Sequence, residues 1–305
     1  MELLIKYTLI YAVVLMLVAL GGMFSERSGV INIALEGIMV IGGLMGVLAI
    51  NLLPQGTSPM VIVLVSTVAA AASGMIYSLL LAFACINLKA DQTIGGTALN
   101  MLATAVAMVV VKGFNKSASA KINYSNKAFL FNIGGVDLNV FLIIGIVVLI
   151  IAAVVLYKTK FGLRLMACGE HPQAADSVGI NVYKMRYSGV ILSGLLGGIG
   201  GFAYIIPPVS SWNFEVGVAG TGFLALAVMI FGQWKPGRIA MAAVFFAVFK
   251  ALANIADSTV LSTLGWSKEI YNMMPFIASM IILAFTSKKS RAPKAEGIPY
   301  DKGQR

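Results

Sequence analysis

The chain has 305 residues, of which 59% are hydrophobic and only 11% charged, and its mean hydropathy is +0.92. Soluble domains carry about 25% charged residues, so a soluble protein of this length would not cover so much apolar surface. The composition therefore indicates a polytopic membrane protein. The net charge of +10 comes from cations grouped in connections and in the tail, which is typical of cytoplasmic loops and does not indicate nucleic acid binding.

Apolar runs long enough to cross a bilayer number about nine, with roughly eight to ten as the range, which predicts an all-α polytopic membrane protein. The connections are short, so residues 1–286 are expected to form a single transmembrane domain. Residues 287–305 are rich in cations and contain two prolines, which predicts a basic, disordered cytoplasmic tail. The predicted spans are 6–23, 31–53, 60–86, 93–112, 138–157, 187–206, 219–232, 237–256 and 270–286.

The stretch 23–39 places two carboxylates, a guanidinium and an amide between two long apolar runs. Charge at the centre of a membrane helix costs roughly 2.5–3.5 kcal/mol per group, so a chain that keeps it near the membrane usually needs a polar path or a break in the helix. We therefore predict a discontinuous helix near residues 24–37, and we favour a transport protein. For Glu26 and Arg27 a simpler interpretation is a solvated cytoplasmic turn.

Three polar residues, two with amide side chains and one with a carboxylate, are candidates for lining a polar pathway. Asn32 and Glu36 are four residues apart, so on a helix they would share one face. We expect them beside a translocation path or in a buried polar contact, with a structural cap as the alternative. Asn100 lies deep in its predicted span and is the third candidate. Lys250 is expected to extend its ammonium outward along the surface of its span rather than to face the pathway.

The run 194–201 is dominated by glycine. It contains two overlapping pairs of small residues spaced four apart, the pattern that lets membrane helices approach closely. We predict that these residues serve helix packing: Gly194, Gly197, Gly198 and Gly201.

The connection 158–186 carries five basic residues against two acidic ones, which places it in the cytoplasm. Within it, Pro172 suits the first position of a helix and Gly179 suits the residue after the last. Two turns of helix fit between them. The sequence therefore predicts a short helix over 172–178 that is exposed to the cytoplasm.

The sequence also excludes several chemistries. No G-x-x-x-x-G-K-[ST] phosphate loop occurs, so ATP is not bound by that route. The single histidine, His171, lies in the cytoplasmic connection, which excludes a Ser/His intramembrane protease and most histidine-rich metal sites. Cys85 and Cys168 are too few for a metal site and form no disulfide framework. We expect no catalytic, metal or cofactor site in this chain and no enzyme.

Three segments resemble the permease subunits of bacterial ABC importers, in the superfamily of branched-chain amino acid, ribose and nucleoside permeases. The stretch 26–37 resembles the N-terminal signature of that family. Its residues are most similar to the signature of the shorter of two nucleoside permeases. The stretch 157–181 is similar to the cytoplasmic coupling segment, with His171 where asparagine is more frequent. The stretch 220–232, followed by Pro236, is similar to a motif of the second half. The three matches span most of the chain in the expected order.

The resemblance implies a mechanism. The short helix over 172–178 would dock on a separate ABC ATPase subunit, which would bind the ATP and Mg. A second, non-identical permease subunit would enclose the path, and an extracellular substrate-binding lipoprotein would deliver a small molecule to outer loops that include 207–218 and 257–269. The complex would lie in the bacterial cytoplasmic membrane, in contact with lipid and not with nucleic acid. The residues implied in ATPase coupling are Arg164, Gly169, Glu170, His171, Pro172, Ala174, Ala175 and Gly179.

Nucleosides are the substrates that the resemblance favours. The alternatives are a permease for a pentose, an autoinducer sugar or a branched-chain amino acid, and, in a different class, an ion-coupled secondary carrier that needs no ATPase. Few carboxylates lie within the predicted spans, which argues against a proton relay of several acidic groups.

Overall fold

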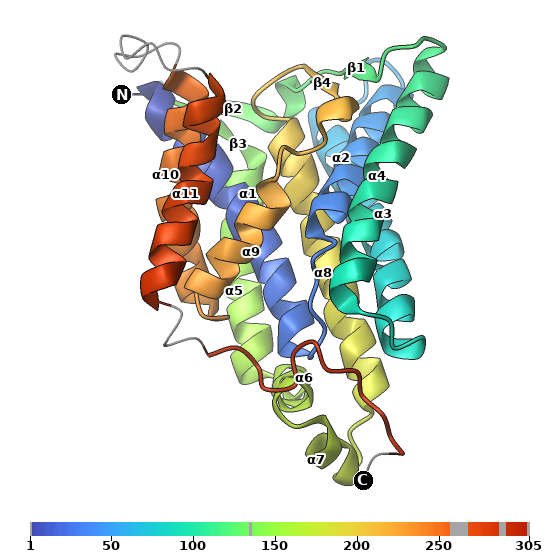
Figure 1. The fold of residues 1–305 in the computed structure, drawn as a ribbon. Coiled ribbons are helices and arrows are strands. Elements are labelled where there is room, and N and C mark those ends of the chain that lie inside the picture. Colours follow the sequence, from blue (N-terminus) through green and yellow to red (C-terminus); the bar gives the residue numbers. More distant parts are fainter. Residues whose placement is uncertain (1, 134–135, 257–267, 287–290, 304–305) are drawn as a thin grey trace.

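The computed structural model describes residues 2–133, 136–256, 268–286 and 291–303. It is a bundle of helices with short strands at one end and two short helices at the other (Figure 1). The long helices are α1 (Glu2–Arg27), α2 (Leu35–Leu52), α3 (Pro59–Ala82), α4 (Gln92–Asn115), α5 (Val140–Lys158), α8 (Val182–Ile205), α10 (Pro236–Ile255) and α11 (Lys268–Thr286). The shorter helices are α6 (Lys160–Glu170), α7 (Pro172–Ser177) and α9 (Thr221–Phe231).

Among the described residues, seven helical stretches are long and apolar enough to cross a membrane, which confirms the prediction of an all-α polytopic membrane protein. One of them is α3 together with a π-helical segment, Phe83–Asn87, that extends it. α9 has 11 residues and is therefore about 16 Å long, roughly half the thickness of a hydrocarbon core. The apolar run 219–232, predicted as a full span, thus contains a half-length helix.

The two ends of the bundle differ. One end, called the strand end below, carries two antiparallel pairs, β1 (Lys121–Asn123) with β4 (Ser211–Asn213) and β2 (Leu130–Ile133) with β3 (Val136–Asn139) (Figure 1). The other end, called the α7 end, carries α6, α7 and the described part of the tail. α1 starts at the strand end, whereas the tail lies at the α7 end.

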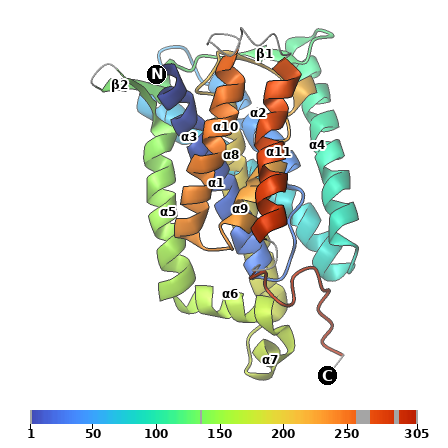
Figure 2. The ribbon, with the colours of Figure 1, turned by 60° about the vertical axis from the view of Figure 1, so that its left-hand side comes forward.

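The helices form two halves with the same order and opposite directions. α1 and α8 pack against each other at the centre. Each is followed by an irregular segment and then by a helix that starts inside the bundle, which is α2 in the first half and α9 in the second (Figures 1 and 2). α3 packs on α8, and α10 packs on α1. Inverted repeats with broken helices of this kind are a recurrent architecture of membrane transporters.

Close approach of α8 to α2 and α3 depends on the glycines of the run 194–201. A Cβ atom added at Gly198 would overlap the carbonyl oxygen of Ala70 in α3, and one added at Gly201 would overlap that of Met39 in α2. At Gly197 it would lie 2.9 Å from Cγ2 of Ile38, and at Gly194 it would overlap the hydroxyl of Ser78. All four glycines therefore lie at backbone-to-backbone or backbone-to-side-chain contacts between helices.

The prediction of a disordered tail is wrong for residues 291–303. This segment lies in turns and irregular backbone across the α7 end, and Ala295 and Tyr300 are buried there. Its partners belong to helices far away in the sequence, so the local composition gave no sign of them. The rest of the predicted tail, 287–290 and 304–305, lies outside the described residues.

We predict that Gly201→Ala lowers the free energy of unfolding by about 1–3 kcal/mol, because the added methyl group overpacks the contact with α2. Gly113→Ala is the matched control, since the space around Gly113 in α4 is open and alanine favours a helix by up to about 1 kcal/mol over glycine. Thermal unfolding of the purified chain in detergent measures both. Equal midpoints for the two variants would contradict the packing role.

Candidate functional site

The irregular segment 28–34 between α1 and α2 is the centre of the candidate site. Inside a membrane, backbone polar groups outside a helix need partners within the protein. The Ser25 hydroxyl donates a hydrogen bond to the Val30 carbonyl oxygen at 2.7 Å. The Ile31 N–H donates to Oε1 of the buried Gln92 at 2.7 Å. The predicted discontinuity near 24–37 is therefore confirmed, and side chains of α1 and α4 satisfy its backbone.

Asn100 holds the start of α2. Its Nδ2 donates to the Ile33 carbonyl oxygen at 2.9 Å, and its Oδ1 accepts from the Gly37 N–H at 2.7 Å. Gly37 leaves room for this approach, because a Cβ there would lie 3.0 Å from the Cα of Asn100. One amide side chain on α4 thus pairs with a donor and an acceptor on either side of the helix start.

Asn32 lies apart from the other two pathway candidates. It is fully buried, and its Nδ2 donates to the hydroxyl of Ser193 in α8 at 2.8 Å. The contact ties the irregular segment to the central helix of the second half. Of the two placements considered for Asn32, the structure therefore shows the buried polar contact.

Glu36 joins the starts of the two broken helices. It lies in the first turn of α2, and its carboxylate accepts hydrogen bonds from the N–H groups of Gly220 at 2.8 Å and Gly222 at 2.6 Å, at the start of α9. Glycine is required at 222, because a Cβ there would lie 2.6 Å from the Cα of Glu36. A carboxylate between two helix N-termini satisfies free N–H groups and interacts favourably with both helix dipoles.

Lys250 faces the same region. The sequence favoured an ammonium that extends outward, but Lys250 in α10 is buried, with 7% of its surface exposed, and its charge interacts with that of Glu36. The expectation was wrong because the side of α10 that carries Lys250 packs into the bundle. A cation near Glu36 partly compensates the cost of keeping a carboxylate inside the membrane.

Glu36 and Asn100 also line a lateral cavity of about 500 Å³ between α2, α4 and α9. Its walls carry hydroxyl, amide, carboxylate, thioether and aromatic groups. The remaining lining residues are Thr97, Met101, Thr104, Ala105, Met108 and Phe223. The sequence reading missed Thr97 and Thr104, although their spacing of three and four residues from Asn100 places all three on one helix face, which was the available signal.

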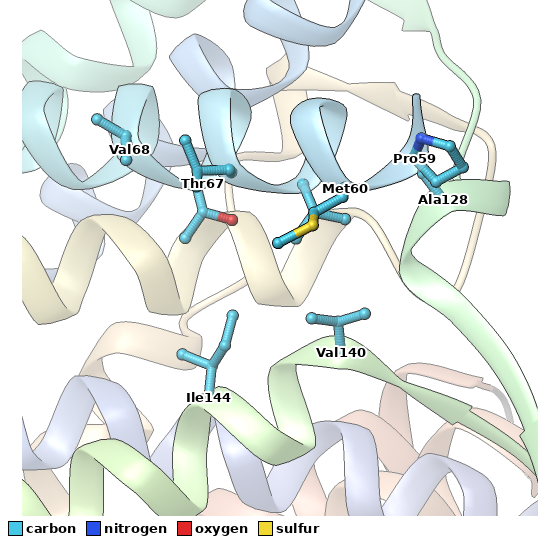
Figure 3. A pocket seen from close by; sticks show the side chains of 9 residues that line it. Pro59, Met60, Thr67, Val68, Ala128, Val140 and Ile144 are labelled. Carbon is cyan, nitrogen blue, oxygen red and sulfur yellow. The ribbon is translucent and has the colours of Figure 1, made fainter. Parts of the chain in front are cut away.

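A second lateral cavity has different chemistry. It measures about 480 Å³ and lies between α3 and α5 near the strand end (Figure 3). Its lining is almost wholly aliphatic, with Met60, Val140 and Ile144 pointing toward it and Thr67 as the single hydroxyl. A wall of this kind suits lipid chains, so the cavity beside Glu36 is the better candidate for a polar solute.

At the α7 end, α6 lies roughly across the bundle and α7 projects beyond it (Figure 2). Thr159 caps α6 by accepting a hydrogen bond from the Gly162 N–H at 3.1 Å. α7 begins at Pro172 and is followed by Gly179, whose φ of +84° suits glycine. The short helix predicted over 172–178 therefore exists, over Pro172–Ser177.

The residues implied in ATPase coupling fall into two groups. One group faces the bundle and is buried: Gly169, Pro172 and Ala175. Gly169 has no space for a side chain, because a Cβ would overlap the carbonyl oxygen of Arg27, and Glu170 forms an ion pair with Arg27 at 3.8 Å. The other group is exposed: Arg164, His171, Ala174 and Gly179. Val178, at the end of the segment expected to dock, is 74% exposed beside them.

We predict that Glu36→Ala lowers the free energy of unfolding by about 1–3 kcal/mol, because it leaves the N–H groups at the start of α9 without an acceptor. Glu36→Gln keeps one acceptor oxygen and is expected to lose less. Thermal unfolding in detergent and hydrogen exchange of the Gly220 and Gly222 amides report the two effects. Unchanged exchange in Glu36→Ala would show that the carboxylate does not cap α9.

Comparisons with known proteins agree with this architecture. A family model described as branched-chain amino acid transport system / permease component matches residues 4–284. The guanosine ABC transporter permease protein NupQ of Bacillus subtilis is 41% identical, over 100% of this chain and 98% of that relative. The nucleoside ABC transporter permease protein NupC of Lactococcus lactis subsp. cremoris is 39% identical over the same shares. A second permease of that organism, NupB, is 28% identical over 55% of this chain and 46% of its own length.

Because the family model covers nearly the whole chain and two relatives align from end to end, this chain belongs to the permease family of the branched-chain amino acid transport system and is a multi-pass membrane permease component.

Proposed function

We propose that this chain is the permease subunit of an ATP-driven, binding-protein-dependent importer of nucleosides in a bacterial cytoplasmic membrane. The observation that carries the proposal is the end-to-end similarity to two relatives whose names specify guanosine and nucleosides. The similarity covers the whole chain, so it includes the broken helices, the lateral cavity and α7 alike.

The cavity that Glu36 and Asn100 line is the proposed wall of the path. It opens at the side of the bundle, so a second subunit against α4 and α9 would close it. NupB and NupC are two unlike permeases of one organism, both named for nucleoside transport, which supports a non-identical partner. Hydroxyl and amide groups suit the ribose hydroxyls of a nucleoside, and Phe223 offers a surface on which a base can stack.

α6 and α7 are the proposed contact with a separate ATPase subunit, which would bind the ATP and Mg. The exposed side of this segment mixes a cation with apolar side chains, and its buried side is fixed on the end of α1 through Gly169. A displacement of α7 would therefore be transmitted to α1 and to the irregular segment that follows it. The bundle face that holds these short helices would lie in the cytoplasm.

The strand end would then face outward and receive the substrate-binding lipoprotein. Of the two loops expected to take part, 207–218 includes β4 and lies at that end. The other, 257–269, falls mostly outside the described residues.

We predict that the complete complex, reconstituted in liposomes, takes up labelled guanosine only when its ATPase subunit hydrolyses ATP. Uptake should persist after an uncoupler abolishes the membrane potential and should stop with a hydrolysis-deficient ATPase. Unlabelled nucleosides should compete, whereas ribose, glucose and leucine should not. Uptake that follows the membrane potential and ignores the ATPase would favour an ion-coupled carrier, and competition by a sugar or leucine alone would reassign the substrate.

We also predict that Val178→Asp reduces uptake about tenfold, because a loss of about 1.4 kcal/mol in docking changes an equilibrium by that factor. The side chain is largely exposed, so the chain itself should fold normally. Val178→Thr, which keeps the size of the side chain and adds no charge, is the control at the same position. Co-purification of the ATPase with each variant measures docking. Equal recovery and equal uptake for both variants would contradict a contact at α7.

A further inference from the structure

Residues 291–303, called the strap below, cross the α7 end from the side of α11 to the side of α8 (Figures 1 and 2). The strap touches five parts of the chain that are distant in sequence. These are the α6–α7 segment, the end of α1, the irregular segment after α1, the start of α8, and the connection between α3 and α4.

The strap is fixed to α6 and α7. The Ala295 N–H donates a hydrogen bond to the Gly169 carbonyl oxygen at 2.8 Å. Tyr300 is buried in a small apolar cluster with Cys168 of α6 and Ala175 of α7. Its ring also meets that of Tyr183 edge-on, with 5.4 Å between the ring centres. A backbone bond and a buried aromatic ring together make the strap follow any displacement of α6 and α7.

The strap is also fixed to the irregular segment. The Gly297 N–H donates to the Gly29 carbonyl oxygen at 3.2 Å. Both glycines have positive φ, +76° and +97°, so both turns need glycine to form without strain. Arg186 at the start of α8 is almost fully buried beneath them, and its Nη1 donates to the Ile298 carbonyl oxygen at 2.9 Å. A guanidinium buried to this degree requires its acceptor, because an unpaired buried charge is costly.

A carboxyl pair adds a third attachment. Glu26 at the end of α1 is buried, and its carboxyl group is hydrogen-bonded to that of Glu296 in the strap, which requires a proton on one of them. The Trp234 indole N–H donates to the Glu26 carboxyl group at 2.6 Å. Burial raises the pKa of Glu296, while the hydrogen bond from Glu26 and the charge of Arg27 act in the opposite direction. The solvated turn considered for Glu26 from the sequence is therefore wrong.

The end of the strap reaches the α3–α4 connection. Asp301 forms an exposed ion pair with Lys89 at 2.7 Å, which contributes little stability because water screens it. The strong attachments of the strap are therefore those to α6, α7, α8 and the irregular segment.

We propose that the strap is a coupling element, which links the displacement of α6 and α7 to the irregular segment between α1 and α2. The inference rests on the proposed function, since it assumes that an ATPase moves α7. A displacement of α7 moves Tyr300 and Ala295, which are attached to α6 and α7. The short backbone stretch from Ala295 to Gly297 transmits this displacement to Gly29. From there the irregular segment leads to Asn32, bonded to α8, and to Glu36, bonded to the start of α9. The strap thus connects the base of the molecule with the cavity wall.

The test compares two complete complexes in liposomes with guanosine. One contains the unaltered chain, and the other contains a chain that ends at residue 290. The measured quantity is the number of guanosine molecules taken up per ATP hydrolysed. We expect the shortened chain to assemble and to support ATP hydrolysis, while the ratio falls about tenfold, within the usual range of coupling between sites.

A point variant keeps the test decisive if the shortened chain does not assemble. Tyr300→Ala removes the buried ring and should lower the ratio in the same direction. Ile298→Ala is the matched control, because this side chain is 55% exposed and the residue bonds to Arg186 through its backbone. The control should keep the ratio of the unaltered chain.

An unchanged ratio in Tyr300→Ala would overturn the coupling role. A loss of uptake and of ATP hydrolysis in equal proportion would also overturn it, because that result indicates that the strap only stabilises the structure. Failure of the proposed function is distinguishable, because the unaltered complex would then show no ATP-dependent uptake. That result would remove the coupling role as well.

Discussion

The carboxylate of Glu36 at the starts of α2 and α9 is the interaction on which the architecture depends. Two helices that begin inside the bundle, α2 and α9, have free N–H groups and positive dipole ends at their starts, which need acceptors within the protein. One side chain satisfies the start of α9 and lies in the first turn of α2. Gln92 accepts a hydrogen bond from the Ile31 N–H, and Asn100 pairs with the Ile33 carbonyl oxygen and the Gly37 N–H, so side chains of α4 support the interruption between α1 and α2.

The same arrangement explains why polar residues border a cavity in a protein with so few charges. Groups that hold the broken helices in place are also the groups that face the space beside them. The structural role of Glu36 and Asn100 is therefore compatible with the pathway role that we propose for them. A substitution at either residue changes the shape of the wall and its chemistry together, and uptake measurements on such variants need a stability measurement beside them.

Much of this was accessible from the sequence because it is encoded locally. Charges between apolar runs indicated the discontinuity after α1, Pro172 and Gly179 bracketed α7, and the glycine spacing marked the packed face of α8. The half-length of α9 was not accessible, since the run 219–232 is apolar throughout and the position of its start depends on Glu36, more than 180 residues away. The inward direction of Lys250 and the fixed position of the strap likewise follow from tertiary contacts. The threonines beside Asn100 were visible as a helical pattern but were not selected.

The strap also has a consequence for how the molecule matures. Membrane proteins enter the bilayer while they are being synthesised, and early segments wait for later ones. Residues 291–303 leave the ribosome after every helix of the bundle, yet they supply the acceptor for Arg186 and the partner of the Glu26 carboxyl group. Until then the base of the newly inserted chain displays an unpaired guanidinium and an open backbone turn at Gly29. Among the described segments, the strap is thus the last to pack, and its closure supplies Arg186 and Gly29 with their hydrogen-bond partners.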